Sequence, residues 1–370
     1  MPSEFCPSRL TLARKRRGMT RSALAQAAHL SANIIQAYER CEKSPSGSTV
    51  QSLADILRFP VEFFSAGDVD EFRADGVSFR ALSSLTAAQR DRALAAGGLA
   101  EQLSQWIEER FTTPAPDVPS LRGFPPESAA EALRAEWRLG ERPIANMLHL
   151  LEARGVRVFS LPTDCSRIDA FSVWRDDIPF VFLTTTKSGE RGRFDAAHEL
   201  GHLTLHQRGG PTGREAESEA DRFASAFLMP RASVIASAPR STTLSYLIKL
   251  KENWMVSVAA LVHRLKSLNL ITEWHYRTLC IELSQKGYRT NEPGQRIQRE
   301  SSQLLSKVFA TLRNEGVSRA TVARELDILG EELESVIFGM VITSVPGGRR
   351  NDPTSARVPS TNRLQVVPND

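Results

Sequence analysis

Two histidines and a glutamate within five residues are the side chains of this chain best placed to do chemistry. His198, Glu199 and His202 form the pattern His-Glu-x-x-His. On a helix, residues four positions apart lie on one face, so both imidazoles can reach one metal ion. The glutamate between them can then act as general base on a water molecule that the metal activates. The apolar neighbours Ala197 and Leu200 indicate a buried helix, which favours a metal site over the alternative, an amphipathic helix with two hydrogen-bonded histidines.

A third ligand should follow, because a catalytic zinc ion usually has three protein ligands and one water molecule. The acidic segment 215–224 has helical periodicity, and within it Glu217 and Asp221 lie four residues apart on one face. This spacing predicts Glu217 as the carboxylate ligand and Asp221 as the acceptor for the second N–H of a ligating histidine. Glu219 points to nearly the opposite side of the helix, where we expect it to be solvated, and Glu215 is a weaker competitor. For any one of these acids, the alternative is an exposed helix charge.

Two separated blocks of the sequence resemble the ImmA/IrrE family of metallopeptidases. The first block, 193–206, contains the histidine motif, and the second, 217–230, begins at Glu217 and ends in Phe-Leu-Met-Pro. The resemblance implies a zincin-like (gluzincin) peptidase fold in which the two histidines and Glu217 hold zinc and Glu199 is catalytic. A donor set of two histidines and a glutamate favours Zn²⁺ and leaves Mn²⁺ open. Several members of this family cleave a partner repressor at a single site, so the resemblance also implies a protein substrate.

The amino-terminal region is basic and rich in helix signals. Residues 1–30 hold six arginines and lysines against one glutamate. Thr20 and Ser31 are typical N-cap residues for two of the helices. The sequence predicts five helices: one before Gly18, then 21–27, 31–40, 50–57 and a short one at 60–64.

Residues 8–64 resemble the Cro/C1-type (XRE) helix-turn-helix domain, which implies that helix 31–40 enters the major groove of DNA. The candidate contacts divide into base readers and phosphate contacts. They are Ser31, Asn33 and Gln36 for bases, and Arg21 and Arg40 for phosphates. His29 stands where this family often has a glycine in the turn. The alternative is a small helical domain that binds protein, but the basic first helix favours nucleic acid.

The middle of the chain predicts a connector and then a small sheet. Thr86 can cap a long helix that contains Gly97-Gly98, and the five prolines of 112–126 indicate an extended linker. Two amphipathic helices follow. The segments 155–161, 170–174 and 179–184 have the alternation and composition of strands. We hypothesise that segment 179–184 binds substrate backbone by strand addition.

Composition narrows the class of protein. The chain has 370 residues, 41% hydrophobic and 24% charged, with a net charge of +4, which is ordinary for a globular protein of two or three domains. No apolar run reaches the ~18 residues of a membrane helix, and the first residues lack the features of a signal peptide. The four cysteines are far apart and form no C-x-x-C pair, which favours a reducing cytoplasm and disfavours an iron–sulfur cluster.

The sequence as a whole predicts a mainly α protein with a small α+β part. The expected units are a five-helix helix-turn-helix domain at 1–66, a helical connector and Pro-rich linker at 67–126, a peptidase domain with a small sheet at 127–240, a helical C-terminal domain at 241–343 and a disordered tail at 344–370. We expect a cytoplasmic DNA-binding regulator whose zinc metalloendopeptidase cleaves a partner repressor protein. Its partners would be an operator DNA and a helix-turn-helix repressor, with no membrane, and a homodimer is left open. The alternative is a transcription factor whose peptidase-like domain is a non-catalytic ligand sensor, although such a domain has no need of Glu199.

Overall fold

The computed structural model describes residues 5–70, 72, 85–165, 167–207, 213–238, 242–295 and 297–341. These residues form a mainly helical fold with one three-stranded sheet, which confirms the predicted fold class. In chain order, the elements are α1 Pro7–Arg16, α2 Arg21–Ala27, α3 Ala32–Glu39, α4 Gly47–Leu57, η1 Val61–Ser65, α6 Ala87–Glu108, α7 Pro126–Glu136, α8 Met147–Ala153, β1 Arg157–Ser160, η3 Thr163–Cys165, β2 Ala170–Arg175, β3 Ile178–Leu183, α9 Gly189–Leu205, α10 Arg214–Leu228, α11 Arg231–Ser237, α12 Leu244–Leu250, η4 Lys251–Asn253, α13 Val258–Ser267, α14 Glu273–Gln285, α15 Gln303–Asn314, α16 Arg319–Glu325 and α17 Gly330–Ile337. Among them, no helix is long and apolar enough to cross a membrane. The expected tail at 344–370 lies outside the described residues.

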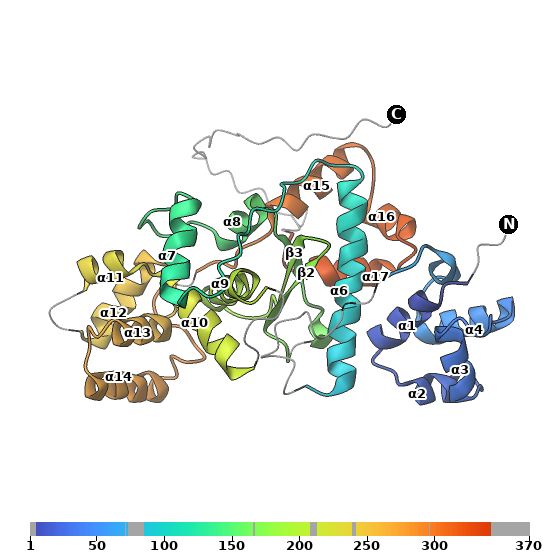
Figure 1. The fold of residues 1–370 in the computed structure, drawn as a ribbon, viewed down its shortest axis with the longest axis horizontal. Helices are drawn as coiled ribbons and strands as arrows, with labels where there is room; N and C mark the ends of the chain where they lie inside the picture. The colour runs from blue at the N-terminus through green and yellow to red at the C-terminus, as the bar shows by residue number, and fades with distance from the viewer. Residues whose placement is uncertain are drawn as a thin grey trace, which may run out of the picture.

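The elements α1 to α4 and η1 form the amino-terminal domain, drawn in blue in Figure 1. Thr20 and Ser31 each accept the backbone N–H three residues further on, so α2 and α3 begin at the predicted caps. In the turn between these helices, His29 has a φ of 54°, the left-handed conformation that a glycine usually supplies. One fully buried apolar side chain from each element lines the core: Leu10, Leu24, Ile35, Leu53 and Phe63.

The sheet has the order β1-β3-β2, so β3 is its central strand. β1 runs parallel to β3, and β2 runs antiparallel to it. Asp176 and Asp177 join β2 to β3 with φ values of 46° and 65°, as a two-residue hairpin turn with two left-handed residues requires. Strand addition needs an unpaired edge. The hypothesis that segment 179–184 binds substrate backbone is therefore wrong, because β3 is paired on both sides.

Helices cover both faces of the sheet (Figure 1). Successive side chains of β2 point to opposite faces. On one face Arg175 pairs with Glu101 of α6 at 3.0 Å. On the other face the indole N–H of Trp174 donates to the carbonyl of Leu203 in α9 at 3.1 Å. The histidine motif, which lies on α9, is therefore held directly against the sheet.

The long helix α6 lies between the sheet and the amino-terminal domain (Figure 1). Two adjacent glycines allow close packing on both sides of it. A Cβ on Gly97 would lie 3.5 Å from the ring of Phe182, and a Cβ on Gly98 would lie 3.0 Å from a methyl group of Leu12 in α1. The glycine pair, which lowers the helix propensity of α6, thus makes room for the sheet and for α1.

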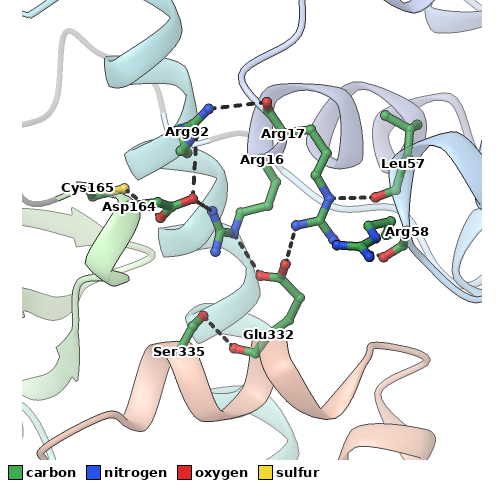
Figure 2. A network of polar contacts seen from close by, with 9 residues as sticks. All are labelled: Arg16, Arg17, Leu57, Arg58, Arg92, Asp164, Cys165, Glu332 and Ser335. Carbon is green, nitrogen blue, oxygen red and sulfur yellow. Dashed lines mark hydrogen bonds and ion pairs between the residues drawn. The ribbon is translucent and has the colours of Figure 1, made fainter. Parts of the chain in front are cut away.

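A network of arginines and carboxylates joins the amino-terminal domain to the rest of the chain (Figure 2). Arg16, at the end of α1, pairs with Glu332 of α17 at 2.7 Å and with Asp164 at 2.8 Å. Arg17 pairs with the other oxygen of Glu332 at 2.6 Å. The Arg16 and Glu332 side chains are only 5% and 4% exposed. Arg16 and Arg17, two of the basic residues that favoured nucleic acid, are therefore paired with carboxylates of the same chain.

The Pro-rich segment 112–126 runs without helix or strand up to residue 125, along the peptidase-like part of the chain, and α7 begins at Pro126. Its backbone is tied to two helices: the N–H of Asp117 donates to Arg154 at the end of α8, and the N–H of Leu121 donates to Thr204 of α9. Val118 and Leu121 are buried. The segment is extended, as predicted, and packed against its neighbours.

The helices after α10 divide between two places. The group α11 to α14 lies at the end of the molecule opposite the amino-terminal domain (Figure 1). The group α15 to α17 returns to the middle, where α15 contacts α8 and α17 contacts α6 and β1. The range 241–343, expected as one helical unit, therefore covers two separate groups of helices.

Candidate metal centre

Two helices, α9 and α10, bring the candidate ligands together. α9 begins at Ser188, whose hydroxyl accepts the N–H of Arg191. α10 crosses α9 at Gly201, which lies between the two motif histidines. A Cβ on Gly201 would lie 3.1 Å from the ring of Phe223 and 3.2 Å from the Cα of Ala220 in α10. The missing side chain therefore lets the backbones of the two helices lie in close contact.

Three buried side chains converge between these helices. The Nε2 atoms of His198 and His202 are 3.1 Å apart. Glu217 places one carboxylate oxygen 3.2 Å from Nε2 of His198 and the other 3.4 Å from Nε2 of His202. One donor atom from each residue lies within 4.8 Å of the others, in a group that could hold a metal ion. The structure thus brings together all three residues that the sequence predicts as ligands.

The donor set fits zinc. Two imidazole nitrogens and one carboxylate are a common set of protein ligands at catalytic zinc sites, which keep a further position for water or substrate. A zinc ligand histidine normally donates its second ring N–H to a carboxylate or another acceptor. Nδ1 of His198 lies 2.9 Å from Oδ1 of Asp221, so Asp221 occupies the position that the sequence predicts for it.

The candidate ligands strongly perturb one another. Burial lowers the pKa of His198, but the hydrogen bonds to Asp221 and Glu217 outweigh burial and raise this pKa to about 10. Burial raises the pKa of Glu217, but hydrogen bonds from His198 and His202 outweigh it and lower this pKa to about 2. The raised pKa favours a positively charged His198, and the lowered pKa favours a negatively charged Glu217. A metal cation held by these residues would also place a positive charge next to Glu217.

The candidate ligand His202 has a different outer contact, which the sequence reasoning did not find. Its Nδ1 lies 2.8 Å from Nδ1 of His206, and Nε2 of His206 lies 3.0 Å from Oε2 of Glu219. Glu219, expected to be solvated, has a side chain that is 24% exposed and is paired with His206. The spacing of His202 and His206 was a visible signal, since residues four apart share a helix face.

Glu199 lies beside the three candidate ligands and is held by the sheet. Its side chain is buried, and its Oε2 accepts a hydrogen bond from the hydroxyl of Ser172 at 2.7 Å. Ser172 is on β2, on the face that packs against α9. Sequence reasoning missed this contact because it depends on how the sheet and the helix are packed, which local periodicity does not give.

Comparison with protein families agrees with this geometry. Residues 151–266 match the family described as IrrE N-terminal-like domain, and residues 10–64 match a helix-turn-helix family. The chain carries an ImmA/IrrE-type domain behind a helix-turn-helix domain. The first match contains β1 to β3, α9 and α10, and therefore every residue of the candidate metal centre. A comparison with curated proteins gives no match.

The helix-turn-helix domain presents α3, the expected recognition helix, on the side away from α6 (Figure 1). Asn33 and Arg40 of this segment are exposed, and Gln36 is half-buried. Ser31 is exposed, but its hydroxyl accepts the N–H of Ile34 and so caps α3. Of the predicted base readers, Ser31 and Asn33 are therefore exposed, and Ser31 also caps the helix.

Arg21, the other predicted phosphate contact, is engaged within the domain. Its Nε lies 2.5 Å from one oxygen of Glu39, and the other oxygen of Glu39 pairs with the buried Arg14 at 2.5 Å. The Arg21 side chain is 45% exposed, so a phosphate can reach it, but that phosphate would compete with Glu39.

Proposed function

We propose that this protein is a DNA-binding transcriptional regulator whose ImmA/IrrE-type domain is a zinc metalloendopeptidase that cleaves a partner repressor at a specific site. One observation carries the proposal: His198, His202 and Glu217 converge on one point, with Glu199 buried next to them. The donor set favours zinc and leaves manganese as the alternative ion. When bound, zinc would act as a Lewis acid that polarises a peptide carbonyl and makes a water molecule more acidic.

Within this proposal the protein's own residues divide the work. Glu199 accepts a proton from the attacking water and passes it to the leaving amine, as a general base and then a general acid. Ser172 donates to one oxygen of Glu199 and so fixes the direction of the carboxylate. Asp221 fixes the ring of His198 through the hydrogen bond at Nδ1. These contacts place the proton acceptor before a substrate arrives, which reduces the reorganisation that the reaction needs.

The helix-turn-helix domain supports DNA as a partner and suggests the kind of substrate. A peptidase tied to a DNA-binding domain meets proteins bound at the same DNA at a raised effective concentration. We therefore propose a helix-turn-helix repressor as the substrate. Helix-turn-helix proteins bind two half-sites as dimers, so we also propose that two copies of this chain bind the operator.

The test is cleavage of helix-turn-helix repressors encoded next to the gene, by the zinc-loaded full chain. The parent should release defined fragments, detected by mass spectrometry. Glu199→Gln keeps the shape of the side chain but cannot take up a proton as a carboxylate does, so cleavage should fall about 10²- to 10⁴-fold. Zinc content should stay unchanged in this variant.

Glu215→Gln is the matched control, because Glu215 is an exposed acid on the same helix as Glu217. This control should cleave at the parent rate. Cleavage by Glu199→Gln at the parent rate would overturn the mechanism. Intact repressors with the zinc-loaded parent would instead support a non-catalytic sensor.

A further inference from the structure

His206 lies at the end of α9, one helical turn after the candidate ligand His202. Its side chain is only 8% exposed, and both of its ring nitrogens are engaged. Nδ1 faces Nδ1 of His202 at 2.8 Å, and Nε2 faces Oε2 of Glu219 at 3.0 Å. The mechanism proposed above uses neither His206 nor Glu219.

The positions of the protons follow from the direction of these contacts. A histidine that binds a metal through Nε2 carries its proton on Nδ1. His202 therefore donates from Nδ1, and Nδ1 of His206 must accept. The proton of the neutral His206 ring then lies on Nε2 and is donated to the carboxylate of Glu219. Both hydrogen bonds, from His202 to His206 and from His206 to Glu219, thus have a donor and an acceptor.

The two candidate ligands are supported differently. His198 donates directly to a carboxylate, that of Asp221. His202 instead has its Nδ1 against Nδ1 of His206, which relays the hydrogen bond to the carboxylate of Glu219. Helix α10 thus supplies Glu217 to the centre itself, and Asp221 and Glu219 to the outer contacts of the two histidines.

We propose that His206 and Glu219 are positioning residues, which hold the ring of His202 in the orientation and tautomer that bind the metal through Nε2. This inference rests on the proposed metal-binding role of His202 and does not depend on peptidase activity. Removal of an outer contact of this kind typically weakens metal binding about 10- to 100-fold. The loss of metal affinity should follow from the missing acceptor for the Nδ1–H of His202, and not from the missing bulk of the His206 ring.

Two substitutions at position 206 separate these causes. His206→Leu removes the acceptor and should weaken zinc binding about 10- to 100-fold, measured by competition with a chelating indicator. The amide oxygen of His206→Asn can accept from His202 in place of Nδ1, so its affinity should stay within a few-fold of the parent. The visible spectrum of bound Co²⁺ reports the ligand geometry and should change in His206→Leu but not in His206→Asn.

His263→Leu is the matched control, because it removes an exposed histidine from α13 and should leave zinc affinity unchanged. Glu219→Leu should weaken binding in the same direction as His206→Leu. Equal zinc affinity for the parent and His206→Leu would overturn the inference, as would equal losses for the Leu and Asn variants. If the variants differ in zinc affinity as expected but the parent cleaves no repressor, the proposed function alone would be overturned. A parent that binds no zinc would overturn both.

Discussion

At the scale of single residues, we expect a proton and a metal ion to compete for His198 in the candidate centre. Its pKa of about 10 reflects hydrogen bonds to Asp221 and Glu217 that outweigh the effect of burial. In the unfolded chain this pKa is about 6.5. Protonation of His198 therefore stabilises the fold fully below about pH 6.5, and this contribution is lost as the pH rises towards 10.

We predict opposite pH trends for chelator-treated and zinc-loaded protein. After treatment with a chelator, the free energy of unfolding should fall between pH 6.5 and 10, by an amount on the order of a few kcal/mol. Zinc must displace the proton from His198, so the increase in melting temperature on adding zinc should be larger at pH 8 than at pH 6. Thermal unfolding at several pH values, with and without zinc, measures both trends. His198→Gln should show neither of these two pH trends. A pH profile of stability in that variant equal to the parent's would contradict the assignment of the trends to His198.

The candidate ligands could be predicted from the sequence because helical spacing places the two histidines on one face, and because the family resemblance implies Glu217 as the third ligand. The outer contacts of the two histidines were harder to predict from the sequence. A helical wheel shows Glu219 nearly opposite Glu217, yet the structure pairs Glu219 with His206 at 3.0 Å. A wheel describes one helix only, and it does not say where the end of a neighbouring helix lies. Ser172 was hidden for the same reason, because its contact with Glu199 joins a strand to a helix.

At the scale of elements, the distance between α9 and α10 decides whether Glu217 reaches the histidines. Gly201 lies where the two helices are in close contact, because an added Cβ would lie 3.2 Å from the backbone of Ala220. Backbone atoms move less easily than the end of a side chain. A larger residue at position 201 should therefore push α10 away from α9 and carry Glu217 with it.

We predict that Gly201→Ala weakens zinc binding and destabilises the fold. Overpacking of this kind costs about 1–3 kcal/mol, more than the ~0.5–1 kcal/mol that alanine gains over glycine inside a helix. Gly192→Ala is the matched control on the same helix, because a Cβ there meets no atom within 4 Å. That control should be slightly stabilising, with unchanged zinc affinity. Denaturant unfolding and indicator competition distinguish the two variants, and equal behaviour would contradict the packing argument.

Helix starts were predictable because capping chemistry is local. Thr20, Ser31 and Thr86 each cap the helix that the sequence assigns to them. The order of the strands was not predictable in this way. Segment 179–184 follows its hairpin partner along the chain, but it pairs with β1 on its other side. Chain order gave no information about which strand lies at an edge.

At the scale of the whole molecule, local charge was a poor guide to what the arginines contact. Arg16 and Arg17 belong to a basic cluster that, read alone, suggests DNA. Their carboxylate partner, Glu332, is more than 300 residues away in the sequence and on the last described helix, α17 (Figure 2). No local pattern predicts a contact over this separation. Ion pairs of Arg16 and Arg17 join the amino-terminal domain to α17 and, through Asp164, to η3.

This arrangement predicts a large effect of one carboxylate on the stability of the chain. Glu332→Ala leaves the buried Arg16 without one of its two partners and Arg17 without its acidic partner. Removing one member of a buried ion pair typically costs about 3–5 kcal/mol. We expect a loss of this size in denaturant unfolding. Glu331→Ala, at the exposed neighbouring position, should change stability by less than about 0.5 kcal/mol.

The same variant tests whether the network of arginines and carboxylates is separate from the candidate metal centre and from α3. The candidate metal centre lies on α9 and α10, and α3 lies on the far side of its domain from α6 (Figure 1). Zinc affinity of Glu332→Ala should therefore match the parent at temperatures where the protein stays folded. Parent-like stability in Glu332→Ala would show that the network in Figure 2 contributes little to holding the domains together. A loss of stability with unchanged zinc affinity would show that the carboxylate fixes the amino-terminal domain without shaping the metal centre.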